Sequence, residues 1–116
     1  YGTNYNTKDG TCIRDFIHVS DIAEIHSRVL EKINKKNKSK ILNCGYGRGI
    51  SVKQVAKEFK KYANKNLRIL EMPKRKGDLV KIIALNKNLN KFIKWRAKFN
   101  KLEIMVKSSL KWERNQ

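Results

Sequence analysis

The chain has 116 residues, a formal net charge of +18 and 40% hydrophobic residues, which suits one small domain or one piece of a larger one. No apolar run approaches the roughly 20 residues that a transmembrane helix needs, and no leader of basic and then apolar residues is found. Cys12 and Cys44 match no metal-ligand spacing, so we expect free thiols and no metal site. These features exclude a membrane protein and a disulfide scaffold, and they predict a cytoplasmic location.

The positive charge comes mainly from lysines that occur in every segment. Lys, Asn and Ile are together what AT-rich codons encode, so coding bias explains the composition without a binding partner. Basic domains attract nucleic acid by neutralising phosphates, but the aromatic residues here do not alternate with basic ones as a base-stacking surface requires. We therefore expect only non-specific binding to nucleic acid, with a dedicated nucleic-acid-binding module as the alternative.

The first twenty residues are rich in turn formers, with the clearest turn at residues 8–10, and residues 13–19 are predicted to be extended. A helix is expected to begin at Ser20 or Asp21, since both side chains suit a helix N-terminus. Its apolar stripe has helical spacing and consists of Ile22, Ile25, Val29 and Ile33. Residues 34–40 are polar and without period, which predicts a loop.

A short strand is predicted over residues 41–44, followed by the glycine-rich stretch 45–49. Ser51 and Gln54 form a capping box that predicts the start of the next helix. The apolar face of that helix is expected to contain Val52, Val55, Ala56 and Phe59.

In the last third, residues 67–72 are predicted to form a strand that ends before a proline, and residues 74–78 a loop. Residues 82–85 are predicted to be extended. Asn86 is expected to cap a short helix that ends near Ile93, and Asn100 to cap the last helix. Such alternation of helices with short strands predicts an α/β fold, here incomplete, because a parallel sheet needs several strands covered on both faces.

Three motifs resemble the UDP-glucose 4-epimerases, a branch of the extended short-chain dehydrogenases. Residues 1–23 read YGTNYNTKDGTCIRDFIHVSDIA and are similar to the family pattern DGT-x-x-RD-[YF]-IHV-x-D-[LI]-A. Residues 42–52 resemble the pattern N-x-G-x-G-x-G-x-SV, and residues 73–78 resemble P-R-R-x-GD. Together with Trp95 and the last helix, the resemblance covers essentially the whole chain.

The resemblance implies the C-terminal, substrate-binding part of an extended short-chain dehydrogenase fold without most of the Rossmann domain. Residues 1–116 would be the nucleotide-sugar-binding portion, and the N-terminal NAD-binding domain would be absent, as a start at Tyr1 also suggests. Complete enzymes of this family interconvert UDP-glucose and UDP-galactose in galactose metabolism with bound NAD, and homodimers are expected of them. The alternative is another nucleotide-sugar epimerase, dehydratase or decarboxylase of the same family.

The family's catalytic residues are a glycine-rich turn for NAD and a Tyr-x-x-x-Lys pair. None of the four tyrosines has a lysine four positions later. We therefore expect no catalytic residue and no cofactor for this chain alone, and no turnover without a missing N-terminal half or a separately encoded partner.

The resemblance also implies four residues that bind the UDP-sugar. Arg14 and Arg75 match the family's diphosphate-binding arginines, and guanidinium groups suit phosphate because they donate planar, charge-assisted hydrogen bonds. Asp78 matches a carboxylate near the ribose, and Tyr1 an aromatic position beside the uracil. The alternatives are an ion pair of Arg14 with Asp15, a solvated Arg75, and a turn-stabilising Asp78.

Two positions depart from the family pattern: Lys74 replaces an arginine, and Ile82 stands where some epimerases have an aromatic residue near the sugar. His18 lies between apolar residues, so we interpret it as structural and not as a general acid or base. The glycine turn that begins at Gly45 imitates a dinucleotide-binding motif, but Ile50 occupies the third glycine position. We therefore expect no NAD binding at that turn.

Overall fold

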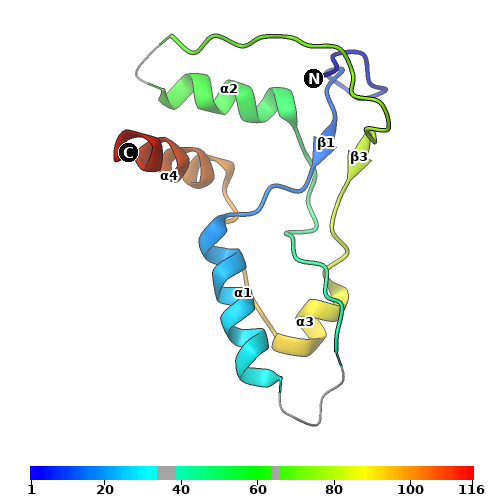
Figure 1. Cartoon of the computed structure of the whole chain (residues 1–116), viewed down its shortest axis with the longest axis vertical. Helices are drawn as coiled ribbons and strands as arrows, with labels where there is room; N and C mark the ends of the chain where they lie inside the picture. The colour runs from blue at the N-terminus through cyan, green and yellow to red at the C-terminus, as the bar shows by residue number, and fades with distance from the viewer. Residues whose placement is uncertain (34–38, 64–65) are drawn as a thin grey trace.

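The computed structural model describes residues 1–33, 39–63 and 66–116 and has an α/β fold, as predicted. In Figure 1, helices α2 and α4 lie in the upper half and α1 and α3 in the lower half, and strands β1 and β3 lie beside α2 and α4 in the upper half. The elements are β1 (Ile13–Arg14), α1 (Val19–Lys32), β2 (Ile50–Ser51), α2 (Val52–Tyr62), β3 (Lys81–Ile82), α3 (Lys87–Ile93) and α4 (Leu102–Arg114).

The sheet joins three segments that are far apart in the sequence. Its strand order is β2-β1-β3, with β1 antiparallel to β2 and parallel to β3. Arg14 is opposite Ile50 on one side and Ile82 on the other. The central strand therefore fixes Arg14 beside the chain that follows the 74–78 loop.

Helix α1 begins at Val19, one residue before the predicted start, because His18 is its N-cap. The Nδ1 atom of His18 accepts a hydrogen bond from the backbone N–H of Ser20 at 3.1 Å, and its Nε2 atom lies 2.9 Å from the Ser108 hydroxyl. The imidazole also stacks on Phe99 with ring centroids 4.8 Å apart. Both ring nitrogens are thus engaged in holding the fold, which supports the structural interpretation of His18.

Helix α2 starts with the predicted capping box. The Ser51 hydroxyl accepts from the Gln54 backbone N–H at 3.1 Å, and the Gln54 side chain accepts from the Ser51 N–H at 2.9 Å. The α2 helix packs on α4, which buries Met105 and Val106. The N-cap of α4 is Lys101 and not the predicted Asn100, whose carbonyl instead accepts from the Arg48 guanidinium.

The main apolar core lies in the lower half of the molecule and joins α1 to α3. Its buried members are Ile25, Leu89, Ile93 and Trp95. Asn86 is the N-cap of α3, but its side chain makes no cap hydrogen bond and donates instead to the Gly45 carbonyl at 3.1 Å. The predicted helix over 87–93 is therefore correct, although its cap works differently.

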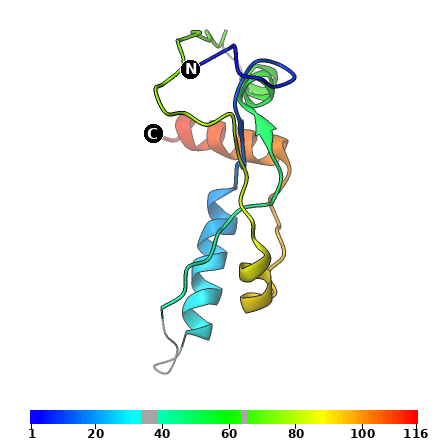
Figure 2. The same cartoon turned by 90° about the vertical axis from the view of Figure 1, so that its right-hand side faces the viewer.

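Two predicted strands do not form, at residues 41–44 and 67–72. Both segments run as extended chain (Figures 1 and 2), but neither has a neighbouring strand among the described residues. Of the segments predicted to be extended, 13–19 and 82–85, only Ile13–Arg14 and Ile82 belong to strands. A strand is defined by its pairing with a neighbouring strand, and the sequence of the segment itself does not say whether such a neighbour is present. Of the predicted loop 34–40, residues 34–38 lie outside the described residues.

The described residues bear on three features: membrane-spanning helices, disulfides and metal sites. No helix in the described ranges has the length and apolarity to cross a membrane. Cys12 is buried and Cys44 half-buried, and both are free thiols. Within the same ranges, no cluster of His, Cys, Asp or Glu is arranged to hold a metal ion.

Candidate functional site

The side chain of Asp78 connects three segments of the chain at the upper end of the sheet. One of its oxygens pairs with the Arg14 guanidinium at 2.5 Å, and the other accepts from the Tyr5 hydroxyl at 2.9 Å. Arg14 also donates to its neighbour's carbonyl, that of Ile13, at 2.8 Å. The ion pair of Arg14 is thus with Asp78 and not with Asp15, and the Asp78 carboxylate bridges distant residues and does not merely stabilise its own turn.

The electrostatics of this group keep the carboxylate ionised. The Tyr5 hydroxyl, followed by the Arg14 and Arg75 guanidinium groups, holds the pKa of Asp78 below its usual range. Burial and the adjacent carboxylate raise the pKa of Tyr5. Asp78 is therefore a fixed negative charge with two arginines near it, and the three charges sum to +1.

Arg75 lies on the loop that leads to Asp78. Its guanidinium carbon is 4.1 Å from the centroid of the Tyr1 ring, a cation–π contact. The Asp78 backbone N–H donates to the Arg75 carbonyl at 3.2 Å, which closes the turn. The 74–78 loop thus carries both Arg75, which contacts Tyr1, and Asp78, which pairs with Arg14 of β1.

Two hollows in the surface adjoin these residues. One, of about 440 Å³, is lined by Arg14 together with Ile82 and residues that include Asn43 and Leu85. The other, of about 430 Å³, is lined by Tyr1, by lysines of α2 and by residues 69–72. Arg14 and Ile82 therefore share one cavity, whereas Tyr1 opens onto another.

Comparison with known proteins identifies the source of the resemblance. The model of the NAD dependent epimerase/dehydratase family matches residues 3–45. The UDP-glucose 4-epimerase of Azospirillum brasilense is 37% identical over 115 residues, which are 99% of this chain and 33% of the relative. A crystal structure of UDP-glucose 4-epimerase from Bifidobacterium longum in complex with NAD+ and UDP superposes with a TM-score of 0.89 at 35% identity, over 100% of this chain and 34% of that one. The chain is a relative of the UDP-glucose 4-epimerases.

The similarity to epimerases is confined to one part of those enzymes. The UDP-Glc/GlcNAc 4-epimerase from Campylobacter jejuni is 40% identical with a TM-score of 0.84, and again the match covers 100% of this chain but only 35% of that protein. The chain spans about a third of the length of the relatives it matches, and the matched region is their C-terminal part. The predicted fold, the C-terminal part of an extended short-chain dehydrogenase, is confirmed.

The glycine turn of this epimerase relative does not fit a dinucleotide. A dinucleotide-binding turn offers free backbone N–H groups to a pyrophosphate. Here the Asp15 carboxylate accepts the N–H groups of Tyr46 at 3.1 Å and Gly47 at 2.9 Å, and also that of Ala84 at 3.2 Å. A pyrophosphate would meet engaged donors and a negative charge. We therefore assign no NAD contact to this turn.

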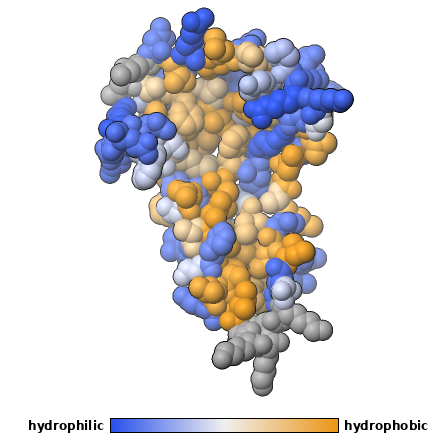
Figure 3. All heavy atoms as spheres, viewed as in Figure 1, coloured by the Kyte–Doolittle hydropathy of each residue, from blue (hydrophilic) through white to orange (hydrophobic). Residues whose placement is uncertain are grey.

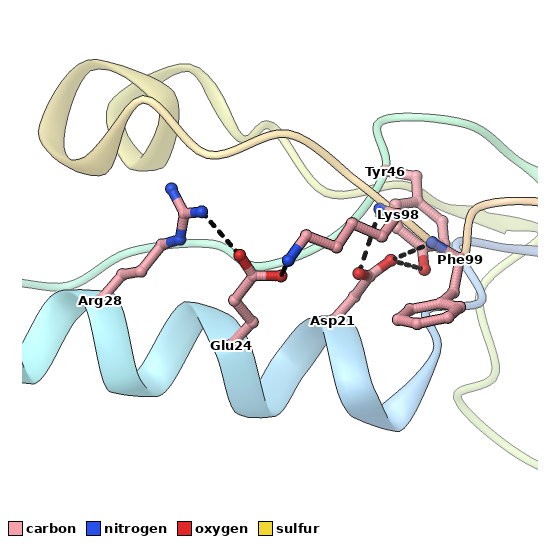
Figure 4. A network of polar contacts seen from close by, with 6 residues as sticks. All are labelled: Asp21, Glu24, Arg28, Tyr46, Lys98 and Phe99. Atoms are coloured by element: carbon pink, nitrogen blue, oxygen red, sulfur yellow. Dashed lines mark hydrogen bonds and ion pairs between the residues drawn. The ribbon is translucent and has the colours of Figure 1, made fainter.

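A second polar network, centred on Asp21, holds the segments below the site (Figure 4). The Asp21 side chain is fully buried and accepts from the Tyr46 hydroxyl at 2.5 Å and from the backbone N–H groups of Lys98 at 3.2 Å and Phe99 at 3.0 Å. The Tyr46 hydroxyl in turn accepts from the His18 N–H at 3.1 Å. The network joins α1 to the glycine turn and to the segment before α4.

The Tyr46 phenol is expected to ionise late. Burial and the hydrogen bond to Asp21 raise its pKa from 10.0 to about 12. Because the fold favours the neutral phenol, this contribution to stability is complete below the unfolded-state pKa and is lost as the pH rises towards about 12. The ultraviolet difference titration of the wild type against Tyr46→Phe should show one phenol with this high pKa while circular dichroism remains native. If the phenol that is lost in Tyr46→Phe instead had an ordinary tyrosine pKa in the wild type, the result would contradict the buried hydrogen bond.

Sequence reasoning missed Tyr5 and the Asp21 network. Tyr5 contacts Asp78 across 73 positions, and Asp21 meets Phe99 across 78. No local pattern predicts such pairs. The only available indication was that Asp21, an acidic residue, lies in the first turn of a helix that carries an apolar stripe.

Proposed function

We propose that this chain is the part of a UDP-sugar 4-epimerase that holds the nucleotide diphosphate. The observation that carries the proposal is the ion pair of Arg14 with Asp78, which lies on the same short loop as Arg75, so that both guanidinium groups act on one carboxylate. The similarity to epimerases supports it, because one of the solved relatives is a complex with UDP. In this proposal the two guanidinium groups bind the diphosphate.

Two guanidinium groups near each other suit a diphosphate better than an anion with a single charge. A UDP-sugar carries two negative charges on adjacent phosphates, and an arginine can donate two parallel hydrogen bonds to such a group. Asp78 partly neutralises Arg14 and fixes its direction, so that the guanidinium is ordered before the ligand arrives. Pre-ordering of this kind lowers the entropy cost of binding.

Asp78 and Tyr1 have supporting roles in the proposed site. Among the described residues, each Asp78 oxygen has one side-chain partner and so keeps a further lone pair for a ribose hydroxyl. One face of the Tyr1 ring is covered by Arg75, so a uracil base would use its other face or its edge. Ile82 lines the same cavity as Arg14 and would adjoin the sugar.

In the proposal, the catalytic machinery belongs to the part of the epimerases that this chain does not match. In the proposal, that part binds NAD, supplies the catalytic tyrosine and acts together with this chain in the cytoplasm, in galactose metabolism. The proposal names no particular sugar, because the Campylobacter jejuni relative is a UDP-Glc/GlcNAc 4-epimerase. This chain alone is expected to bind UDP weakly and to be inactive.

The test is a titration of the ¹⁵N-labelled chain with UDP, with uridine and with pyrophosphate, followed by NMR. UDP should shift the backbone amides of Arg14 and of residues 75–78 with a Kd on the order of 1 mM, and uridine at the same concentration should not. Pyrophosphate should shift the same amides. UDP shifts scattered over the lysine-rich helices that vanish in about 0.3 M salt would show non-specific polyanion binding and contradict the proposal.

A further inference from the structure

Tyr5 is a buried aromatic residue in a stretch of chain that is otherwise mostly exposed or half-buried. It is 5% exposed, whereas Asn4 and Asn6 on either side of it are exposed. The loop around it is closed by the Tyr5 backbone N–H, which donates to the Gly10 carbonyl at 2.8 Å. A ring held in a polar loop stays buried only if another segment covers it. Here that segment is the 74–78 loop of the proposed nucleotide site.

The Tyr5 ring joins the first loop of the chain to the 74–78 loop. The Nζ atom of Lys74 is 4.4 Å from the ring centroid, a cation–π contact. Gly2 adjoins both side chains and has a φ of +75°. A Cβ atom at this position would collide with the Cε2 atom of Tyr5 and lie 2.8 Å from the Cγ atom of Lys74. The absence of a side chain at Gly2 therefore leaves the room in which Tyr5 and Lys74 meet.

The Tyr5 hydroxyl is directed at the Asp78 carboxylate. It donates to Oδ2 at 2.9 Å, while Nη2 of Arg14 donates to Oδ1 at 2.5 Å. Because the two donors hold different oxygens, the carboxylate cannot rotate about its Cβ–Cγ bond without losing at least one of them. The Tyr5 hydroxyl thus fixes the orientation of the Asp78 carboxylate, and the ion pair transmits this orientation to the Arg14 guanidinium.

Burial distinguishes Tyr5 from the residues that would contact a ligand. In Figure 3, hydrophilic side chains gather at the upper right, where Figure 1 shows the chain that leads into β3. Arg75 is exposed, and the side chains of Arg14 and Asp78 are 22% and 24% exposed. Tyr5 lines neither of the two hollows that adjoin these residues. It is therefore placed to act through Asp78 and not on the ligand itself.

We propose that Tyr5 is a positioning residue of the nucleotide site, which orients Asp78, and through it Arg14, before a UDP-sugar binds. This inference rests on the proposed function and adds to it a residue that does not contact the ligand. Groups that are already ordered lose less entropy on binding, so the hydroxyl strengthens UDP binding from a distance. The phenol stays protonated at neutral pH, because burial and the Asp78 carboxylate raise the pKa of Tyr5.

The first arm of the test compares Tyr5→Phe with the wild type in the absence of ligand. The Tyr5 hydroxyl is the largest of the influences that lower the pKa of Asp78. In the variant this pKa should therefore rise, as ¹³C NMR of the side-chain carboxyl groups will show, and the Arg14 Nε–H peak should shift. Four other ionisable or charged groups lie near the pair and are unchanged in the variant: Arg14, Arg75, Lys74 and Cys12.

The matched control is Tyr62→Phe, at the last residue of α2. Lys107 and then the Tyr62 hydroxyl lower the pKa of Glu103, so this variant also takes a phenol hydroxyl away from a carboxylate. Both variants keep the aromatic ring, and both should retain the native circular dichroism. Tyr62→Phe should leave the pKa of Asp78 and the Arg14 peak as they are in the wild type.

The second arm measures UDP binding by NMR titration at neutral pH. Tyr5→Phe should weaken binding about 3-fold to 10-fold, and Tyr62→Phe by less than about 2-fold. In an Asp78→Ala background, Tyr5→Phe should have no further effect, because the hydroxyl then has no carboxylate to orient. A tyrosine that only supported the fold would instead weaken binding by the same factor in both backgrounds.

The outcomes separate this inference from the proposed function. If Tyr5→Phe binds UDP as tightly as the wild type, leaves the pKa of Asp78 unchanged, or weakens binding equally with and without Asp78, the positioning role is overturned while the nucleotide site stands. If the wild type itself does not bind UDP, the proposed function fails, and the inference that rests on it fails as well.

Discussion

Replacing Asp21 by alanine is expected to lower the free energy of unfolding by about 3–5 kcal/mol. The substitution removes the acceptor for the Tyr46 hydroxyl and for the backbone N–H groups of Lys98 and Phe99. The two N–H groups would lose their partner in a buried place, and each such orphaned donor costs about 1–3 kcal/mol. Urea denaturation followed by circular dichroism at neutral pH measures the loss.

The matched control for Asp21 is Glu24, an acidic residue one turn later on the same helix. Glu24 pairs with the Arg28 and Lys98 side chains at 2.7 and 3.1 Å near the surface (Figure 4), and such pairs contribute at most about 1 kcal/mol. Glu24→Gln should therefore change the free energy of unfolding little. In both variants the slope of this free energy against urea concentration should equal that of the wild type. Equal losses for Asp21→Ala and Glu24→Gln would show that the buried network does not hold the segments together.

Replacing either Arg14 or Arg75 by alanine is expected to weaken UDP binding about 10-fold or more, because a charge-assisted hydrogen bond contributes about 1.5–3 kcal/mol. Arg14→Lys should restore only part of the affinity, since an ammonium keeps the charge but not the planar pair of donors. The dissociation constants come from NMR titrations of each variant with UDP.

Arg96→Ala is the control for this series, because it removes the same charge from an exposed position between α3 and α4. It should lower UDP affinity much less than the other two substitutions. The Tm of Arg14→Ala must be measured in parallel, as this variant also breaks the ion pair with Asp78. Equal losses from all three alanine variants would mean that UDP responds to the overall charge and not to a site.

Local sequence patterns predicted the helices well. The capping box of Ser51 and Gln54 is formed by atoms three residues apart, and the stripe that contains Ile25 depends only on helical spacing. Such features are determined within one or two turns of chain. The motif around Arg14 predicted the fold for a different reason, namely its similarity to the epimerases.

The parts that could not be predicted depend on distant partners. The extended segments 41–44 and 67–72 have the composition of strands, but pairing is a property of a neighbour that the segment does not encode. Tertiary packing likewise decides three further features. They are the contact of Tyr5 with Asp78, the burial of Asp21, and the position of the N-cap of α4 at Lys101, one residue after the predicted Asn100. Sequence similarity indicated which residues form the candidate site, but not that Asp78 already pairs with Arg14.

The most direct test of the account is the NMR spectrum of the arginine Nε–H groups during a UDP titration, with the two peaks assigned from Arg14→Lys and Arg75→Lys. If both guanidinium groups hold one diphosphate, their peaks move together and reach saturation at the same UDP concentration, while the Arg96 peak stays in place. Peaks of Arg14 and Arg75 that saturate at different UDP concentrations, or a response from only one of them, would contradict a shared diphosphate site.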